Sequence, residues 1–181
     1  MNETDLRVIR TRQNLINALH EMLLSQSFDS ITVSEIVKRA LINRATFYAH
    51  FHDKYDLLDS TIGSLTDNVF EIPAQKLIQR PFETFFKAVT PAFWDLFNAQ
   101  IEDSEFRNVF KDFATRLFKT RVETLPADVL DEMSIFIFLA TVRGLIDWVE
   151  KKPGQHDFEN LTMPRHMDAY FQRLFQLQNI D

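Results

Sequence analysis

Four side chains that can hydrogen-bond to nucleic acid lie within seven residues of one another: Arg44, Thr46, Tyr48 and His50. A guanidinium can donate to O6 and N7 of guanine in the major groove, while hydroxyl and imidazole groups can donate to phosphate oxygens. Phe47 and Phe51 stand four residues apart in the same run, so on a helix they share one face. We therefore expect a short helix that is anchored by the two rings and presents its polar side to a duplex.

The residues before this run have the spacing of a second short helix and a tight turn. Thr32 and Glu35 stand three apart before an apolar stretch, which predicts a capping box at a helix start. Asn43 is a favourable N-cap for the helix that follows. Residues 31–51 therefore read as two short helices joined by a turn, the arrangement of a DNA-binding helix-turn-helix.

With these residues in view, the segment from about Arg7 to Leu65 resembles the N-terminal domain of TetR-family transcriptional regulators. The most specific part is residues 44–51, Arg-Ala-Thr-Phe-Tyr-Ala-His-Phe, followed by Lys54 and the pair Leu57-Leu58. The turn position that is usually Gly in the family is Leu41 here. If the turn needs a left-handed backbone at that position, a leucine there costs roughly 1 kcal/mol.

The residue types and the resemblance together predict a DNA-binding set in which Arg44 reads a base and most of the others contact phosphates. The set is Thr32, Ser34, Asn43, Arg44, Ala45, Thr46, Tyr48, Ala49, His50 and Lys54. We place the DNA-binding domain at residues 1–52 and an effector-binding and dimerisation domain at residues 53–181.

Composition favours an all-α chain of about nine helices that binds rather than catalyses. The sequence has only 3 Gly and no Cys, which disfavours a turn-rich β architecture, disulfides and thiolate metal sites. Its histidines lack metal-ligand spacing and its serines lack a nucleophile-elbow context, so we expect no enzyme, cofactor or metal site. The excess of six acidic residues lies wholly within residues 57–181. Without an apolar leader or a membrane-length apolar run, we expect a soluble cytoplasmic protein.

The second half of the chain is rich in phenylalanine at helical spacing. Most of the 18 phenylalanines lie after residue 80, and Pro91 inside this pattern predicts a helix kink. For any single ring, ordinary core packing is the more common role. In the family, the resemblance implies, this bundle encloses a pocket for a small-molecule effector. The pocket-lining residues that we expect are Phe86, Phe93, Phe113 and Thr141.

The last two helices that we expect are the candidates for a homodimer interface. The stretch of about 129–150 is apolar nearly all round between Ile135 and Val142, so it should be buried on more than one side. Residues 144–149 also resemble the penultimate helix of a C-terminal domain common in Firmicutes members of the family. The interface residues that we expect are Trp148, Tyr170, Phe171 and Phe175. The alternative is a monomer with a wide core.

These observations favour a TetR-type transcriptional regulator, of the repressor kind, that a small effector releases from a near-palindromic operator. Two alternatives stay open from the sequence. One is a helix-turn-helix regulator that is controlled by a protein partner and has no small ligand. The other is a helical ligand-binding protein whose helix-turn-helix has no DNA function.

Overall fold

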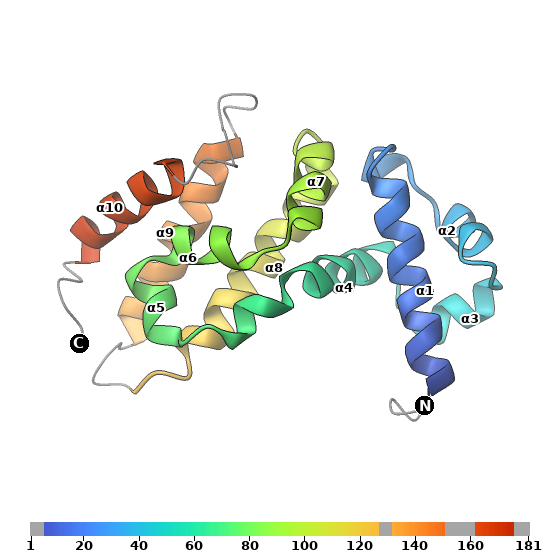
Figure 1. Cartoon of the computed structure of the whole chain (residues 1–181), viewed down its shortest axis with the longest axis horizontal. Helices are drawn as coiled ribbons and strands as arrows, with labels where there is room; N and C mark the ends of the chain where they lie inside the picture. Colours follow the sequence, from blue (N-terminus) through green and yellow to red (C-terminus); the bar gives the residue numbers. More distant parts are fainter. Residues whose placement is uncertain (1–5, 127–131, 151–161, 176–181) are drawn as a thin grey trace. The chain divides into compact units, whose positions relative to one another are not determined.

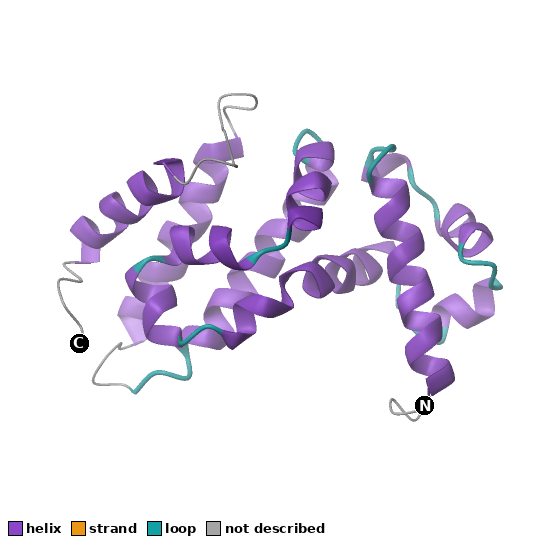
Figure 2. Cartoon of the chain, viewed as in Figure 1, coloured by secondary structure: helices purple, strands orange, loops and turns teal. Residues whose placement is uncertain are grey.

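A computed structural model of the chain describes residues 6–126, 132–150 and 162–175, and everything below concerns these residues. They form ten α-helices and two short 3₁₀ helices with no strand among them, which confirms the all-α expectation (Figures 1 and 2). The elements in chain order are α1 (Leu6–Leu23), η1 (Phe28–Ser30), α2 (Val33–Arg39), α3 (Arg44–Tyr48), α4 (Lys54–Thr66), η2 (Asp67–Glu71), α5 (Ala74–Gln79), α6 (Pro81–Ala88), α7 (Pro91–Gln100), α8 (Ser104–Val122), α9 (Glu132–Glu150) and α10 (Thr162–Phe175).

The chain divides into two compact units. Unit 1 comprises residues 1–65 and 95–110, and unit 2 comprises residues 66–94 and 111–181. Unit 1 therefore holds more than the N-terminal 52 residues, because most of α4, the end of α7 and the start of α8 pack with them. A functional boundary at residue 52 remains a proposal.

The core of unit 1 is built from the inward faces of short amphipathic helices. Leu15, Leu19 and Leu23 recur along α1 at helical spacing and are fully buried, as the pattern predicts. Leucines of α4 and phenylalanines of the helix-turn-helix complete this core. Other fully or nearly fully buried apolar residues of unit 1 are Phe28, Ile31, Ile36, Phe47, Phe51, Leu57, Leu58, Ile62, Leu96 and Phe106. This shared core holds α2 and α3 against α1 and α4.

The core of unit 2 is largely aromatic. The Phe171 ring of α10 makes edge contacts with Phe82 and Phe138, with ring centroids 6.4 and 5.0 Å apart. Phe118 packs against Phe138 and Phe85 in turn. Edge-to-face pairs of this kind add stability beyond the area that they bury. Most phenylalanines of the second half are therefore packing residues.

Pro91 has a different effect from the predicted kink. The helix that we expected to continue through it is two helices, because α6 ends at Ala88 and α7 begins at Pro91. A proline fits the first turn of a helix, where its missing N–H would have no intrahelical partner. Helix α5 was not foreseen either. It is a six-residue helix between Pro73 and Arg80.

Between Ile135 and Val142, helix α9 is buried on one side only. Phe138 and Val142 face the core of unit 2 and are almost completely buried. Met133, Phe136 and Ile137 on the same helix are exposed, with 66%, 68% and 46% of their surface accessible. The expectation of burial on several sides is therefore wrong for a single chain. None of the described helices combines the length and apolarity that a membrane crossing requires.

Candidate nucleic-acid interface

The start of α2 is closed by the capping box that the sequence predicts. The Thr32 hydroxyl accepts a hydrogen bond from the backbone N–H of Glu35 at 3.3 Å. The Glu35 carboxylate in return accepts from the Thr32 backbone N–H at 2.9 Å and from the Thr32 hydroxyl at 2.7 Å. These hydrogen bonds from Thr32 hold the pKa of Glu35 below its usual value. The helix therefore begins at a fixed residue, and Ser34 is exposed in its first turn.

The turn between α2 and α3 has the left-handed residue that the sequence suggested. Leu41 has a φ of 56° and is 92% exposed. The backbone N–H of Ile42 donates to Val37 O at 3.0 Å, and that of Leu41 donates to Lys38 O at 3.4 Å. This pair of bonds is the Schellman motif, which usually has glycine at its left-handed position. Leu41 therefore holds a strained backbone without burying its own side chain.

Helix α3 is short and firmly anchored. The Asn43 side-chain oxygen accepts from the Thr46 backbone N–H at 2.7 Å, so Asn43 is the predicted N-cap. Phe47 is fully buried and Phe51 is 2% exposed, which confirms both as anchors. The helix itself spans only Arg44–Tyr48, and the residues as far as Phe51 that we expected in it form the turn that follows.

The polar face of this segment is open to solvent. Arg44 is exposed, and no described residue forms a hydrogen bond or ion pair with its side chain. Tyr48 is 55% exposed, with its ring packed edge-on against Phe47 at a centroid distance of 5.2 Å. Ala45 and Ala49 are exposed beside them. A free guanidinium, a hydroxyl and two small residues on one side of an anchored helix can approach base edges and phosphates closely.

Three of the expected contact residues are partly committed to the fold. The Thr46 hydroxyl donates to the Asn43 side-chain oxygen at 3.0 Å, so both residues serve first as the cap of α3. His50 is half-buried, and no described residue hydrogen-bonds to its Nδ1. Burial, with the nearby Arg12 charge, lowers the pKa of His50. His50 therefore offers a duplex a neutral imidazole at neutral pH rather than a cation.

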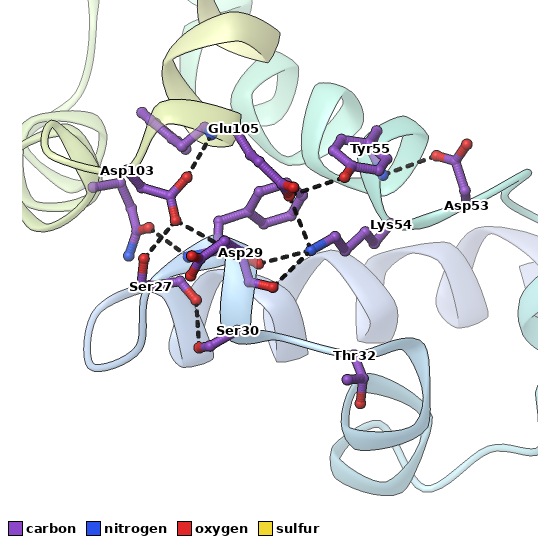
Figure 3. Close-up of polar contacts among 12 residues, drawn as sticks. Ser27, Asp29, Ser30, Thr32, Asp53, Lys54, Tyr55, Asp103 and Glu105 are labelled. Atoms are coloured by element: carbon purple, nitrogen blue, oxygen red, sulfur yellow. Dashed lines mark hydrogen bonds and ion pairs between the residues drawn. The ribbon is translucent and has the colours of Figure 1, made fainter.

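Lys54 is not the free phosphate ligand that we expected. Its ammonium donates to the backbone oxygens of Phe28 and Asp29 at 3.0 and 3.1 Å and pairs with the Glu105 carboxylate at 3.2 Å (Figure 3). It also lies 4.5 Å from the centroid of the Phe28 ring. Three acceptors satisfy the three N–H groups of an ammonium, and only 16% of the side chain is exposed. Lys54 is a structural cation that joins α4, η1 and α8.

Arg12 is a residue of this region whose role the sequence did not reveal. Its guanidinium donates to the backbone oxygen of His50 at 2.8 Å and lies 4.3 Å from the centroid of the Phe51 ring. It thereby ties the end of the helix-turn-helix to α1. The basic cluster of Arg7, Arg10 and Arg12 was visible in the sequence, but its target 38 residues away was not. Arg12 and His50 also line a groove of about 580 Å³ in unit 1.

The residues expected to line an effector pocket are only partly brought together. Phe86 and Phe93 both contact Trp94, at centroid distances of 4.5 and 5.0 Å, and both contact Phe85. Phe93 and Phe113 are buried, whereas Phe86 and Thr141 are half-buried. The Thr141 hydroxyl donates to Ile137 O of its own helix at 2.8 Å. The groove described above lies in unit 1 and does not involve these four residues.

The residues expected at a dimer interface need one correction. Phe171 is fully buried against Phe82 and Phe138 in its own chain, so it is a core residue and cannot anchor a partner. Tyr170 is 63% exposed, as an interface residue requires. Trp148 and Phe175 lie in α9 and α10, but their side chains are outside the part that the structure describes.

Comparison with known proteins matches the segment that carries this interface. Residues 15–61 fit the family model for bacterial regulatory proteins of the tetR family. Residues 15–61 therefore form a domain of the tetR-family type. The matched residues run from the middle of α1 through the helix-turn-helix and into α4.

Relatives of known sequence match about a third of this chain. It is 41% identical over 61 residues to the uncharacterized HTH-type transcriptional regulator YxbF of Bacillus subtilis (strain 168). It is 32% identical over 63 residues to the HTH-type transcriptional repressor BepR of Brucella suis biovar 1 (strain 1330). These matches cover 33% and 35% of this chain but only 16% and 30% of the two relatives.

The fold of the whole chain also has a solved counterpart. NalD, the secondary repressor of the MexAB-OprM multidrug efflux pump in Pseudomonas aeruginosa, superposes with a TM-score of 0.52. The alignment covers 91% of this chain and 94% of NalD at 14% sequence identity. At that identity the likeness concerns the fold alone. It extends the similarity from the N-terminal domain to the helices that follow.

Proposed function

We propose that this TetR-family chain is a sequence-specific DNA-binding transcriptional regulator, of the repressor type, that acts on a near-palindromic operator in the cytoplasm. The observation that carries the proposal is the open polar face of α3 and its flanking residues. Arg44 is exposed and has no described partner, while Phe47 and Phe51 fix the backbone behind it. An anchored helix with an uncommitted arginine suits readout of guanine in a major groove.

The protein would bind its operator as a homodimer through the exposed face of α9. Met133, Phe136 and Ile137 follow the three-and-four spacing of one helix face, and Ala140 and Gly144 continue that face as exposed small residues. An added Cβ at Gly144 would meet no described atom within 4 Å, so this part of the face has room for a close neighbour. A second copy would bury an apolar stripe that otherwise faces water. A two-fold dimer matches a palindromic site, because each protomer reads one half.

A small effector bound among the helices of unit 2 would lower operator affinity. Effector binding that favours a DNA-incompetent state reduces affinity by the coupling free energy between the two sites. The aromatic side chains around Phe85 and Trp94 suit an apolar or aromatic molecule. Alternatively, a protein partner controls the DNA-binding state and no small ligand exists. Equal operator affinity with and without a confirmed ligand would eliminate effector release.

Selection of bound duplexes from a random pool tests the DNA-binding proposal directly. Full-length protein should enrich a near-palindromic sequence, and the enriched duplex should bind two copies of the chain. Enrichment of no sequence at low salt would reject the proposal and leave a helical ligand-binding protein as the better interpretation. The same assay identifies the operator that all later measurements need.

A further inference from the structure

The corner between α7 and α8 holds the segment that leads into the helix-turn-helix. Gln100, at the end of α7, is 2% exposed and accepts from the Phe28 backbone N–H at 3.0 Å. Its amide nitrogen donates to the backbone oxygens of Leu23 and Gln26. One buried amide therefore satisfies three backbone groups between the last residue of α1 and the first residue of η1.

Asp103 makes the second attachment at this corner. One carboxylate oxygen accepts from the Phe106 backbone N–H at 2.8 Å and caps α8. The other accepts from the Ser27 hydroxyl at 2.5 Å and from the Asp29 backbone N–H at 2.8 Å (Figure 3). Burial works to raise the pKa of Asp103, but these hydrogen bonds outweigh it and keep the pKa below its usual value. The carboxylate thus stays charged, which strengthens both sets of bonds.

Glu105 makes the third attachment, through α4. Its carboxylate accepts from the Tyr55 hydroxyl at 2.9 Å and pairs with Lys54, whose ammonium donates to the backbone oxygens of η1 (Figure 3). The hydrogen bond to Glu105 raises the pKa of Tyr55. Side chains at 100, 103 and 105 therefore all reach the η1 region, directly or through Lys54.

We propose that Gln100, Asp103 and Glu105 are positioning residues for duplex binding, which hold η1 so that Thr32 and Ser34 can reach the DNA backbone. This inference rests on the proposed function. Thr32 and Ser34 follow η1 within four residues and are exposed. Only Ile31 separates the held segment from Thr32, so a movement of η1 would also displace the start of α2. Helices α7 and α8 each continue into residues of unit 2, where the effector would bind.

The test compares full-length Asp103→Asn with full-length Glu102→Gln. Asn retains one oxygen for the α8 cap and places an amide where Ser27 and Asp29 need an acceptor. Glu102 lies one residue away, is exposed, and undergoes the same change of charge. The readouts are operator affinity as a function of salt, and hydrogen exchange of the Ser30 and Ile31 amides, which donate to Ser27 O and Phe28 O.

We expect Asp103→Asn to weaken operator binding about fivefold near 0.15 M salt relative to Glu102→Gln, as for one lost hydrogen bond. The salt slope should not change, because the hydroxyls of Thr32 and Ser34 are neutral and release no counterions from a phosphate. Its Ser30 and Ile31 amides should exchange faster, whereas Glu102→Gln should match the wild type in both. Ser27→Ala, which removes one arm of the attachment, should give a smaller change in the same direction. A merely less stable protein would instead show faster exchange of amides throughout unit 1, not at Ser30 and Ile31 alone.

Three outcomes decide between the possibilities. Asp103→Asn with the affinity and exchange of Glu102→Gln overturns the positioning role and leaves the proposed function intact. Weaker binding with amides that exchange faster throughout unit 1 assigns Asp103 to stability alone and also overturns it. A wild-type protein that prefers no duplex rejects the proposed function, and the positioning role with it.

Discussion

The carboxylate of Asp168 in α10 accepts a hydrogen bond from the backbone N–H of Glu83 in α6 at 2.8 Å. The pKa values of these two neighbouring residues are shifted in opposite directions from their ordinary values. Burial raises the pKa of Asp168 to about 6 despite a further bond from the Phe82 N–H. Hydrogen bonds from Lys87, and then from Arg165 and Arg80, outweigh the effect of burial and lower the pKa of Glu83 to about 2. In unit 2, α6 and α10 are therefore joined by two carboxylates of different character. Burial disfavours the charged form of Asp168, whereas hydrogen bonds from three cationic side chains stabilise the charged form of Glu83.

Asp168→Asn should change the pH dependence of stability. The raised pKa means that between about pH 4 and pH 6 the folded state binds more protons than the unfolded state. Stability therefore falls as the pH rises through this window, by about 2–3 kcal/mol from this group, and is level above it. Asparagine cannot ionise, so the stability of the variant relative to wild type should improve from about pH 4 to pH 6. Denaturant unfolding across this range measures the difference.

The cost of the lost acceptor in Asp168→Asn is the same at every pH, so it shifts the curve without changing its slope. Glu83 contributes in a separate window, because its lowered pKa gives stability above about pH 4.5 that is lost only as the pH falls toward 2. Parallel curves for wild type and Asp168→Asn between about pH 4 and pH 6 would contradict the raised pKa.

Leu41→Gly should stabilise the fold. Its φ of 56° strains any residue with a Cβ, and the exposed side chain contributes little packing in return. Relief of the left-handed strain is worth about 1 kcal/mol. Leu41→Ala is the matched control, because it keeps the Cβ and should stay within about 0.5 kcal/mol of wild type. Equal unfolding midpoints for the Gly and Ala variants would show that the turn stores no strain.

Arg44→Ala should alter sequence preference more than fold. Loss of a guanidinium that bridges one guanine should remove about 1–3 kcal/mol of discrimination at one base pair in each half-site. Selection from a random pool should then show a flattened position, with thermal stability unchanged. Lys119→Ala removes an exposed cation of α8, outside the helix-turn-helix, and is the control that should keep the preference. Equal weakening on every sequence would instead make Arg44 a phosphate contact.

Phe136→Glu should prevent self-association. Phe136 is the most exposed of the three large apolar side chains on the open face of α9, and a buried unpaired carboxylate there would oppose pairing of two copies. Phe70→Glu changes another exposed phenylalanine, 44% accessible in η2, and should leave the assembly intact. Sedimentation velocity of the three proteins distinguishes the species. A wild-type monomer would contradict the proposed homodimer, and a Phe136→Glu dimer would show that the interface lies elsewhere.

The parts of the site that follow local rules could be predicted from the sequence. The Thr32–Glu35 box, the Asn43 cap and the left-handed Leu41 all depend on residues within five positions of one another. Phe47 and Phe51 were assigned from helical spacing alone. Such features need no knowledge of the tertiary fold.

The misplaced residues depend on partners that are distant in the sequence. Lys54 was expected on a phosphate, but its acceptors lie near residue 28 and at Glu105. Phe171 was expected at an interface, but rings from α6 and α9 cover it. Pro91 is compatible with either a kink or a helix start, and the sequence alone does not choose between them.

The five-residue length of α3 limits the number of base pairs that one protomer can contact through this helix. At about 1.5 Å per residue the helix rises only about 7.5 Å, close to two base-pair steps. One protomer therefore contacts too few base pairs to specify a unique site in a genome. In the proposed homodimer, selectivity would come from the two copies together and from how readily the base pairs between the half-sites bend.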